Sequence, residues 1–118
     1  MIKEVAFVAI AVTDKERARK FYQETLELKP ISSGMEGAWV EYDLGTATIG
    51  VGCSPDWKPS RDGTTVAFEV EDIDAAVARL KERGVTFDMD KLETPICWRA
   101  QFRDPGGNKL VVHKRKSK

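Results

Sequence analysis

The alternation of hydrophobic and polar residues predicts a first strand over residues 5–12. One face of this strand would carry Val8, Ile10 and Val12, and the other Phe7, Ala9 and Ala11. Thr13 followed by Glu16 forms a capping-box pattern, and an apolar stripe with helical spacing runs from there to Lys29-Pro30. We therefore expect a helix after the strand, covering the valine and isoleucine face.

Two further strands are predicted at residues 38–44 and 47–53, joined at Gly45-Thr46 as a short hairpin. The next segment, 54–63, contains two prolines and several turn residues, which is typical of a linker. With a two-residue loop at Gly45-Thr46, Glu41 pairs with Gly50 and Trp39 with Gly52.

The second half of the chain repeats the first. Residues 7–18 and 65–76 align without a gap at an offset of 58, with five of twelve positions identical. The pattern predicts a strand at 65–70 and a helix that Asp72 caps and Gly84 ends. Strands at 85–89, 97–103 and 109–113 follow, the last two joined by the turn sequence DPGGN. The second half therefore predicts one strand, one helix and three more strands, and the repeat assigns the same design to the first half, where the pattern locates two of the three later strands.

Composition and charge fit one soluble domain of 118 residues. The formal net charge is zero, but the last residues are strongly basic, so the body of the chain is acidic. This balance argues against nucleic acid as the main partner. Cys53 and Cys97 lie far apart without metal-ligand spacing, which favours reduced thiols. The sequence has neither a long apolar run nor a signal-peptide pattern, so we expect a cytoplasmic protein without a membrane partner.

Three segments carry a resemblance to a known family: VAIAVTDKERARKFYQETLEL, TVAFEVEDIDAAVARLKERGV and FRDPGGNKLVV. Together they resemble the vicinal oxygen chelate superfamily of glyoxalases, bleomycin resistance proteins and extradiol dioxygenases. The resemblance covers nearly the whole chain. It implies an α+β fold in which two βαβββ modules, 1–53 and 64–114 with linker 54–63, form an open, barrel-like cup within a single domain, 1–118. It also implies a homodimer.

Metal-dependent members of that family place one ligand on the first strand of each module and one on the last. By this resemblance, the four positions fall here on Phe7, Gly50, Thr65 and Val111. These residues offer no imidazole, thiolate or carboxylate donor, and the chain has one histidine in total. We therefore expect no metal and no other cofactor, and no metal-dependent glyoxalase or dioxygenase activity.

Strand alternation and hairpin pairing give the expected lining of the cup. Gln101 is expected near Val111 and Arg99 near His113, with Glu69 at the rim. The candidate ligand-binding residues are Phe7, Trp39, Glu41, Thr65, Arg99, Gln101, Val111 and His113. Aromatic and small residues with a few polar anchors suit an organic ligand.

Several of these residues have alternative interpretations that the sequence leaves open. Phe7 and Trp39 also fit a structural core, which is the commoner outcome for aromatic residues on strands, and His113 fits an exposed strand end. Glu41 and Arg99 fit a structural ion pair. Trp57 in the linker fits a lid or an exposed anchor, although loop aromatic residues more often pack down. Asp104 and Asn108 fit the turn that contains them.

The leading hypothesis is a metal-free protein that binds an aromatic or amphipathic small molecule, as the bleomycin resistance proteins do. The alternative is a lyase or isomerase-type enzyme of the same superfamily. It would use Glu41 or His113 as general acid or base, and Arg99 would hold an anionic substrate. A third hypothesis is a subunit that only dimerises or docks on another protein, which predicts a filled cup.

Overall fold

The computed structural model describes residues 1 and 3–116 and divides the chain into two compact units. The N-terminal unit comprises Met1–Pro59, and the C-terminal unit begins at Ser60. The division falls inside the predicted linker 54–63, while the exact module limits stay a prediction.

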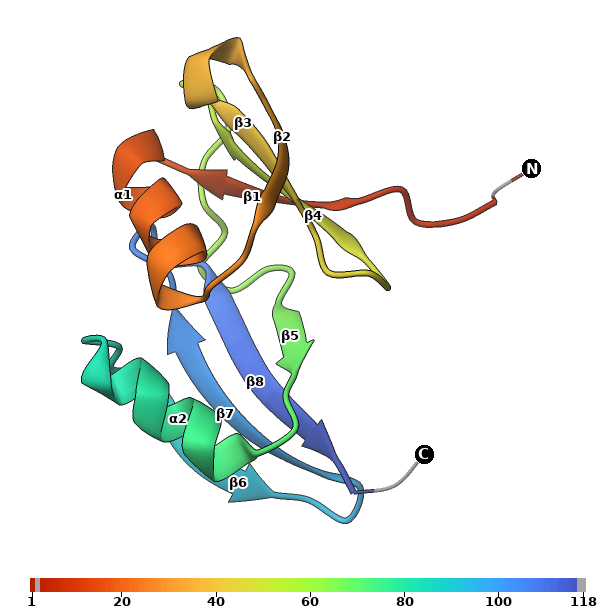
Figure 1. The fold of residues 1–118 in the computed structure, drawn as a ribbon, viewed down its shortest axis with the longest axis vertical. Coiled ribbons are helices and arrows are strands. Elements are labelled where there is room, and N and C mark those ends of the chain that lie inside the picture. Colours follow the sequence, from red (N-terminus) through yellow and green to blue (C-terminus); the bar gives the residue numbers. More distant parts are fainter. Residues whose placement is uncertain (2, 117–118) are drawn as a thin grey trace. The chain divides into compact units, whose positions relative to one another are not determined.

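The N-terminal unit is a four-stranded sheet with a helix on one face (Figure 1). Its strands are β1 Val8–Val12, β2 Pro30–Gly34, β3 Trp39–Asp43 and β4 Thr48–Cys53, in the spatial order β1-β4-β3-β2. The β1–β4 pair is parallel, and the other pairs are antiparallel. The predicted hairpin is confirmed, because Leu44 N donates to Ala47 O at 2.9 Å and Gly45 has a positive φ of 92°.

The helical segment after β1 differs from the predicted uninterrupted helix. It consists of α1 Lys15–Arg19 followed by the π-helical turn η1 Lys20–Thr25, in which Leu26 N donates to Phe21 O. In this segment Tyr22 is fully buried and stacks on Tyr42, with ring centroids 6.1 Å apart. The helix does cover the predicted face of β1, because Ala18 and Val12 line one hollow.

The capping-box prediction at Thr13 is wrong. The N-cap is Asp14, whose side chain accepts a hydrogen bond from Arg17 N at 3.0 Å. Asp72 takes the equivalent role in the second helix, accepting from Ala75 N at 3.0 Å. Both copies of the repeat therefore use an aspartate to satisfy the free N–H groups of the first turn.

The C-terminal unit repeats the same design (Figure 1). Its elements are β5 Val66–Glu69, α2 Ile73–Glu82, β6 Phe87–Glu93, β7 Cys97–Arg103 and β8 Lys109–Arg115, with the strand order β5-β8-β7-β6. Ala100 and Phe102 on β7 are completely buried, on the face that α2 covers. The predicted α+β fold of two βαβββ modules is confirmed, and neither four-stranded sheet closes into a barrel.

Three element predictions need correction. The first strand begins at Val8 and not at residue 5, and the strand predicted at 85–89 is β6, Phe87–Glu93. β2 was not located by the sequence patterns, because its sequence PISSG has a proline, a glycine and no apolar alternation. All of β2 is exposed at the edge of its sheet. Because β2 has no buried face, its sequence does not alternate between apolar and polar residues.

The DPGGN turn between β7 and β8 is held by its own side chains. Asp104 Oδ1 accepts from Gly106 N at 3.0 Å and from Asn108 N at 2.9 Å, and Asp104 Oδ2 accepts from Asn108 Nδ2 at 2.9 Å. Asn108 also accepts from Ser60 N at 3.0 Å. Both side chains are buried, which supports their interpretation as structural residues of the turn.

Candidate functional site

The face of the N-terminal sheet opposite α1 is built from small residues on β1 and β4 and larger ones on β3. The register pairs Glu41 with Gly50 and Trp39 with Gly52, as the hairpin length predicted, and the parallel β1–β4 pair places Ala9 beside Gly50. Paired residues on neighbouring strands share a face, so the two glycines form a shallow strip beside Trp39 and Glu41.

Trp39 occupies the space that these glycines leave open. A Cβ at Gly50 would overlap Trp39 Cη2 and Cζ2, and a Cβ at Gly52 would lie 2.9 Å from Trp39 Cε3 and 2.5 Å from Trp57 Cζ3. Both indoles therefore lie against the backbone of β4, which only glycine permits at this distance.

Phe7 and Glu41 complete this cluster. The Phe7 and Trp39 rings meet edge to face, with centroids 5.4 Å apart and an interplanar angle of 72°. Trp39 Nε1 donates to Glu41 Oε2 at 2.9 Å, which fixes the indole in the plane of the sheet face. We call Phe7, Trp39 and Trp57 the aromatic platform. Phe7 is 47% exposed and Trp57 36% exposed, so the platform presents apolar surface to solvent.

The C-terminal unit places a second group of polar side chains on the corresponding face of its sheet. The register pairs Glu69 with His113 and His113 with Arg99, so the three residues form one row across β5, β8 and β7. In the next row, Ala67 pairs with Val111 and Val111 with Gln101. The predicted neighbours Gln101/Val111 and Arg99/His113 are therefore direct cross-strand pairs.

Glu69 binds His113 closely, with 2.6 Å between Oε1 and Nδ1. Its second oxygen, Oε2, accepts from Arg115 N at 2.8 Å. This backbone hydrogen bond is the largest cause of a lowered pKa of Glu69; the hydrogen bond from His113 and the positive charge of Arg115 also lower the pKa, and desolvation opposes them. The sequence placed Glu69 only at the rim. The contact of Glu69 with His113 depends on the parallel pairing of β5 and β8, and no turn sequence predicts that pairing.

Gln101 and Arg99, two other candidates in this unit, differ in their hydrogen bonding. Gln101 Nε2 donates to Asp88 Oδ2 at 3.3 Å, and Arg103 Nε donates to the same oxygen at 2.6 Å. Arg99 Nε is buried and has no hydrogen-bond acceptor among the residues that the structure describes. Thr65 is half-buried just before β5, and Val111 is buried.

The structure thus brings the eight predicted residues together in two groups. Phe7, Trp39 and Glu41 meet in the N-terminal unit, and the other five lie along the sheet of the C-terminal unit: Thr65, Arg99, Gln101, Val111 and His113. A Glu41–Arg99 ion pair would join the two units and stays a prediction. The role of each residue in binding is likewise still a proposal.

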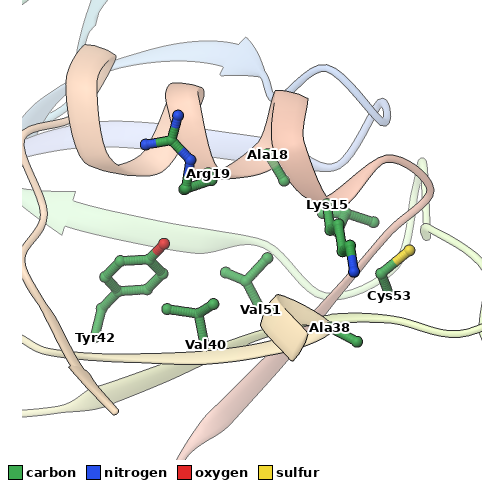
Figure 2. A pocket seen from close by; sticks show the side chains of 10 residues that line it. Lys15, Ala18, Arg19, Ala38, Val40, Tyr42, Val51 and Cys53 are labelled. Atoms are coloured by element: carbon green, nitrogen blue, oxygen red, sulfur yellow. The ribbon is translucent and has the colours of Figure 1, made fainter. Parts of the chain in front are cut away.

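A hollow lies on the other face of the N-terminal sheet, beneath α1 (Figure 2). It has about 220 Å³ of empty space, part of it open to solvent, with Lys15 and Cys53 at one end and Arg19 and Tyr42 at the other. Gln23 Nε2 donates to the Tyr42 hydroxyl at 3.1 Å, and burial raises the pKa of that hydroxyl. This hollow is smaller than the usual cavities for organic ligands, and none of the eight candidate residues lines it.

The positions at which metal-dependent relatives carry ligands do not fit a metal here. Gly50 lies beneath the Trp39 indole, and the Phe7 ring packs against that indole. Val111 is buried and has no side-chain donor atom for a metal. Across residues 1 and 3–116, the structure contains no cluster of three or more His, Cys, Asp or Glu side chains suited to a metal ion.

Comparison with known families identifies the class. The chain belongs to the Glyoxalase/Bleomycin resistance protein/Dioxygenase superfamily, whose sequence model matches residues 4–112. This confirms the resemblance seen in the sequence. No helix in the described part of the chain is long and apolar enough to cross a membrane.

Two solved structures are similar to nearly the whole chain. Among solved structures, TnmS3, an antibiotic binding protein from Streptomyces sp. CB03234, is 27% identical with a TM-score of 0.82 and 98% of each chain covered. A superfamily member from Sphaerobacter thermophilus is also 27% identical, with a TM-score of 0.78 over 96% of this chain and 98% of that one.

A curated relative is similar in sequence. The anthracycline biosynthesis protein DauV of Streptomyces sp. (strain C5) is 33% identical over 112 residues, which cover 87% of this chain and 38% of DauV. The chain therefore spans well under half the length of this relative.

Proposed function

We propose that this protein binds a planar aromatic small molecule on the aromatic platform of its N-terminal unit without a metal ion. The observation that carries the proposal is the arrangement of Trp39 against Gly50 and Gly52, with Phe7 edge to face against it. Two glycines beneath two indoles destabilise the strand that carries them, because glycine weakens strand interiors. A binding surface explains this arrangement.

The chemistry of the platform favours a flat, mostly apolar ligand with a polar edge. Indole and phenyl faces stack with aromatic rings, and each such pair contributes about 0.5–1.5 kcal/mol beyond the area it buries. Glu41 lies beside the indole nitrogen and offers a side-chain oxygen that accepts hydrogen bonds from hydroxyl or amine groups at the edge of a ligand. Polycyclic hydroxyquinones and their amino sugar derivatives combine these features.

Two relatives support this class of ligand. TnmS3 is described as an antibiotic binding protein, and DauV as an anthracycline biosynthesis protein. Anthracyclines are planar polycyclic quinones, so the platform and the relatives point to one kind of molecule. The homodimer and the cytoplasmic location expected from the resemblance belong to the same proposal, and light scattering on the purified protein measures the first.

The proposal is tested with an anthracycline as the probe. A ligand that binds the native state raises the melting temperature. We expect stabilisation of the wild-type protein and a much smaller shift for Trp39→Ala. Trp98→Ala is the matched control, because Trp98 belongs to the other unit and packs under Lys116, 4.8 Å from its ring centroid. Equal shifts for the wild type and Trp39→Ala would exclude the platform as the binding site.

A second candidate function is a lyase or isomerase-type enzyme, and one observation favours His113 over Glu41 for its acid or base. The carboxylate of Glu69 orients the His113 ring, whereas Glu41 is occupied by the Trp39 indole. Turnover of any substrate that survives in the double variant Glu41→Gln/His113→Ala would remove both residues from that role.

A further inference from the structure

The row Glu69–His113–Arg99 in the C-terminal unit is a separate feature from the aromatic platform. All three side chains lie on the sheet face opposite the buried Ala100 and Phe102. Directly paired residues on neighbouring strands have Cβ atoms about 4.5–5.5 Å apart, so His113 lies within contact distance of both neighbours. The row therefore brings a carboxylate, an imidazole and a guanidinium together on one face.

Glu69 determines which nitrogen of His113 carries the hydrogen. Because two hydrogen bonds and Arg115 hold the pKa of Glu69 low, its side chain is a carboxylate and can only accept. The 2.6 Å contact with His113 then requires the hydrogen on Nδ1. Nε2 has no partner in the described part of the chain and is left to meet a ligand.

Arg99 has no anionic partner in its own sheet. The four carboxylates that the strands of this sheet carry are each paired with another side chain: Glu69 with His113, Asp88 with Arg103, Asp90 with Lys81, and Glu93 with Lys116. Arg99 Nε is nevertheless buried and lacks an acceptor among the described residues. Arg99 as a whole is only half-buried, so an external anion can approach the guanidinium and neutralise its charge.

We propose that Arg99 and His113 form a binding site for the carboxylate of a small organic acid, with Glu69 as the positioning residue. Arg99 donates to one carboxylate oxygen. The second oxygen shares a proton with His113 Nε2, and this proton is taken up from solvent as the anion binds. No bond other than these hydrogen bonds forms or breaks. The site lies within the C-terminal unit and stands whether or not the aromatic platform binds its ligand.

The charged groups around His113 make this proton uptake specific to an anion. Glu69 faces the ring from β5, Arg99 from β7, and Arg115 lies two residues further along β8. A carboxylate neutralises Arg99 and accepts a hydrogen bond from protonated Nε2, whereas an uncharged amide of the same shape leaves the charge of Arg99 in place and gives Nε2 no reason to take up a proton. Charge and not shape should therefore control binding.

The single histidine makes a direct test possible, because imidazole ¹⁵N NMR signals of the whole protein come from His113 alone. Without ligand we expect one protonated nitrogen, Nδ1, and one unprotonated nitrogen, Nε2. Titration with benzoate should shift the Nε2 signal toward the protonated form and saturate, while benzamide at the same concentrations should leave it unchanged. Equal responses to benzoate and benzamide, or no response to benzoate, would overturn the proposal.

Variants separate the roles of the three residues. Arg99→Met should lower the affinity for benzoate at least tenfold. Lys114→Met should leave that affinity unchanged, because Lys114 carries a neighbouring positive charge on the other face of β8. Glu69→Ala should leave the hydrogen of His113 exchanging between Nδ1 and Nε2, a spectral change that a purely structural role would not produce. Unchanged affinity in folded Arg99→Met, or an unchanged tautomer in Glu69→Ala, would contradict the assignment.

Discussion

The indole of Trp39 lies so close to the backbone of Gly50 that a Cβ at position 50 would overlap its ring carbons. This relationship links sequence to function in the N-terminal unit. The glycine creates the space, the hairpin register brings Trp39 beside it, and Glu41 fixes the indole nitrogen. The aromatic platform depends on all three.

Gly50→Ala should therefore displace Trp39. The added methyl group cannot be accommodated without moving the ring, and overpacking of this kind lowers the free energy of unfolding by about 1–3 kcal/mol. We expect a changed Trp39 fluorescence and a loss of anthracycline affinity of about tenfold, or about 1.4 kcal/mol. The control is Gly34→Ala, where a Cβ meets no atom within 4 Å. Unchanged fluorescence and affinity in Gly50→Ala would contradict the role of the glycine.

Glu41 should matter as a hydrogen-bond acceptor and not as an acid or base. Glu41→Gln keeps a side-chain oxygen for Trp39 Nε1, so we expect anthracycline affinity close to that of the wild type. Glu41→Leu leaves the indole N–H without its acceptor, and the free energy of unfolding should fall by about 1 kcal/mol. Urea unfolding and ligand titration of both variants measure this. A larger loss of ligand affinity in Glu41→Gln than in Glu41→Leu would favour the enzymatic interpretation.

Asp104 should be essential to stability. Asp104→Ala removes the acceptors of three hydrogen bonds in a buried turn, where the side chain is 4% exposed. We expect the free energy of unfolding to fall by about 2–4 kcal/mol in urea titrations. The exposed Asp62 in the same unit provides the comparison, and its replacement by alanine should change stability by less than about 0.5 kcal/mol. Similar effects at the two positions would show that the turn does not depend on Asp104.

The two neighbouring capping candidates should behave differently. Asp14→Ala removes the acceptor for Arg17 N, at a cost of about 0.5–2 kcal/mol in the free energy of unfolding. Thr13→Ala removes an exposed hydroxyl that takes no part in the cap, so its effect should be near zero. Chemical denaturation of the pair distinguishes them, and a greater loss in Thr13→Ala would reverse the assignment.

Glu69 should make stability depend on pH in the acid range. Its pKa is lowered in the folded state from an ordinary value of 4.5, so its contribution is complete above that value. The contribution is lost as the pH falls through the lower, folded-state pKa. The stability difference between the wild type and Glu69→Gln should therefore be constant near neutrality and shrink below about pH 4. A difference that grows on acidification would mean that the carboxylate is not stabilised in the folded state.

Local sequence signals predicted much of this fold. The repeat at an offset of 58 gave both modules, and the Gly45-Thr46 loop gave the register that places Trp39 and Glu41 beside the glycines. Asp14 was missed in favour of the adjacent Thr13, although its counterpart Asp72 in the second copy was recognised. Comparing the two copies position by position would have corrected that choice.

Features that depend on long-range packing were not predictable in the same way. β2 has no apolar alternation and is exposed throughout, so its pairing with β3 leaves no mark on the pattern. Glu69 and His113 are 44 positions apart in the sequence and meet because β5 and β8 pair in parallel. Parallel pairing depends on how the long connection between the two strands packs, and no short turn sequence marks it. The packing of Trp57 on Gly52 depends on the turn that bridges Ser54 and Trp57.

A planar aromatic ligand should bind this protein without a metal ion. The most direct measurement is an equilibrium titration of the full chain with an anthracycline, followed by tryptophan fluorescence, in the presence of excess EDTA. We predict saturable binding that EDTA does not change and that Trp39→Ala weakens at least tenfold. Absence of binding in EDTA, with recovery on addition of a divalent metal ion, would contradict the account.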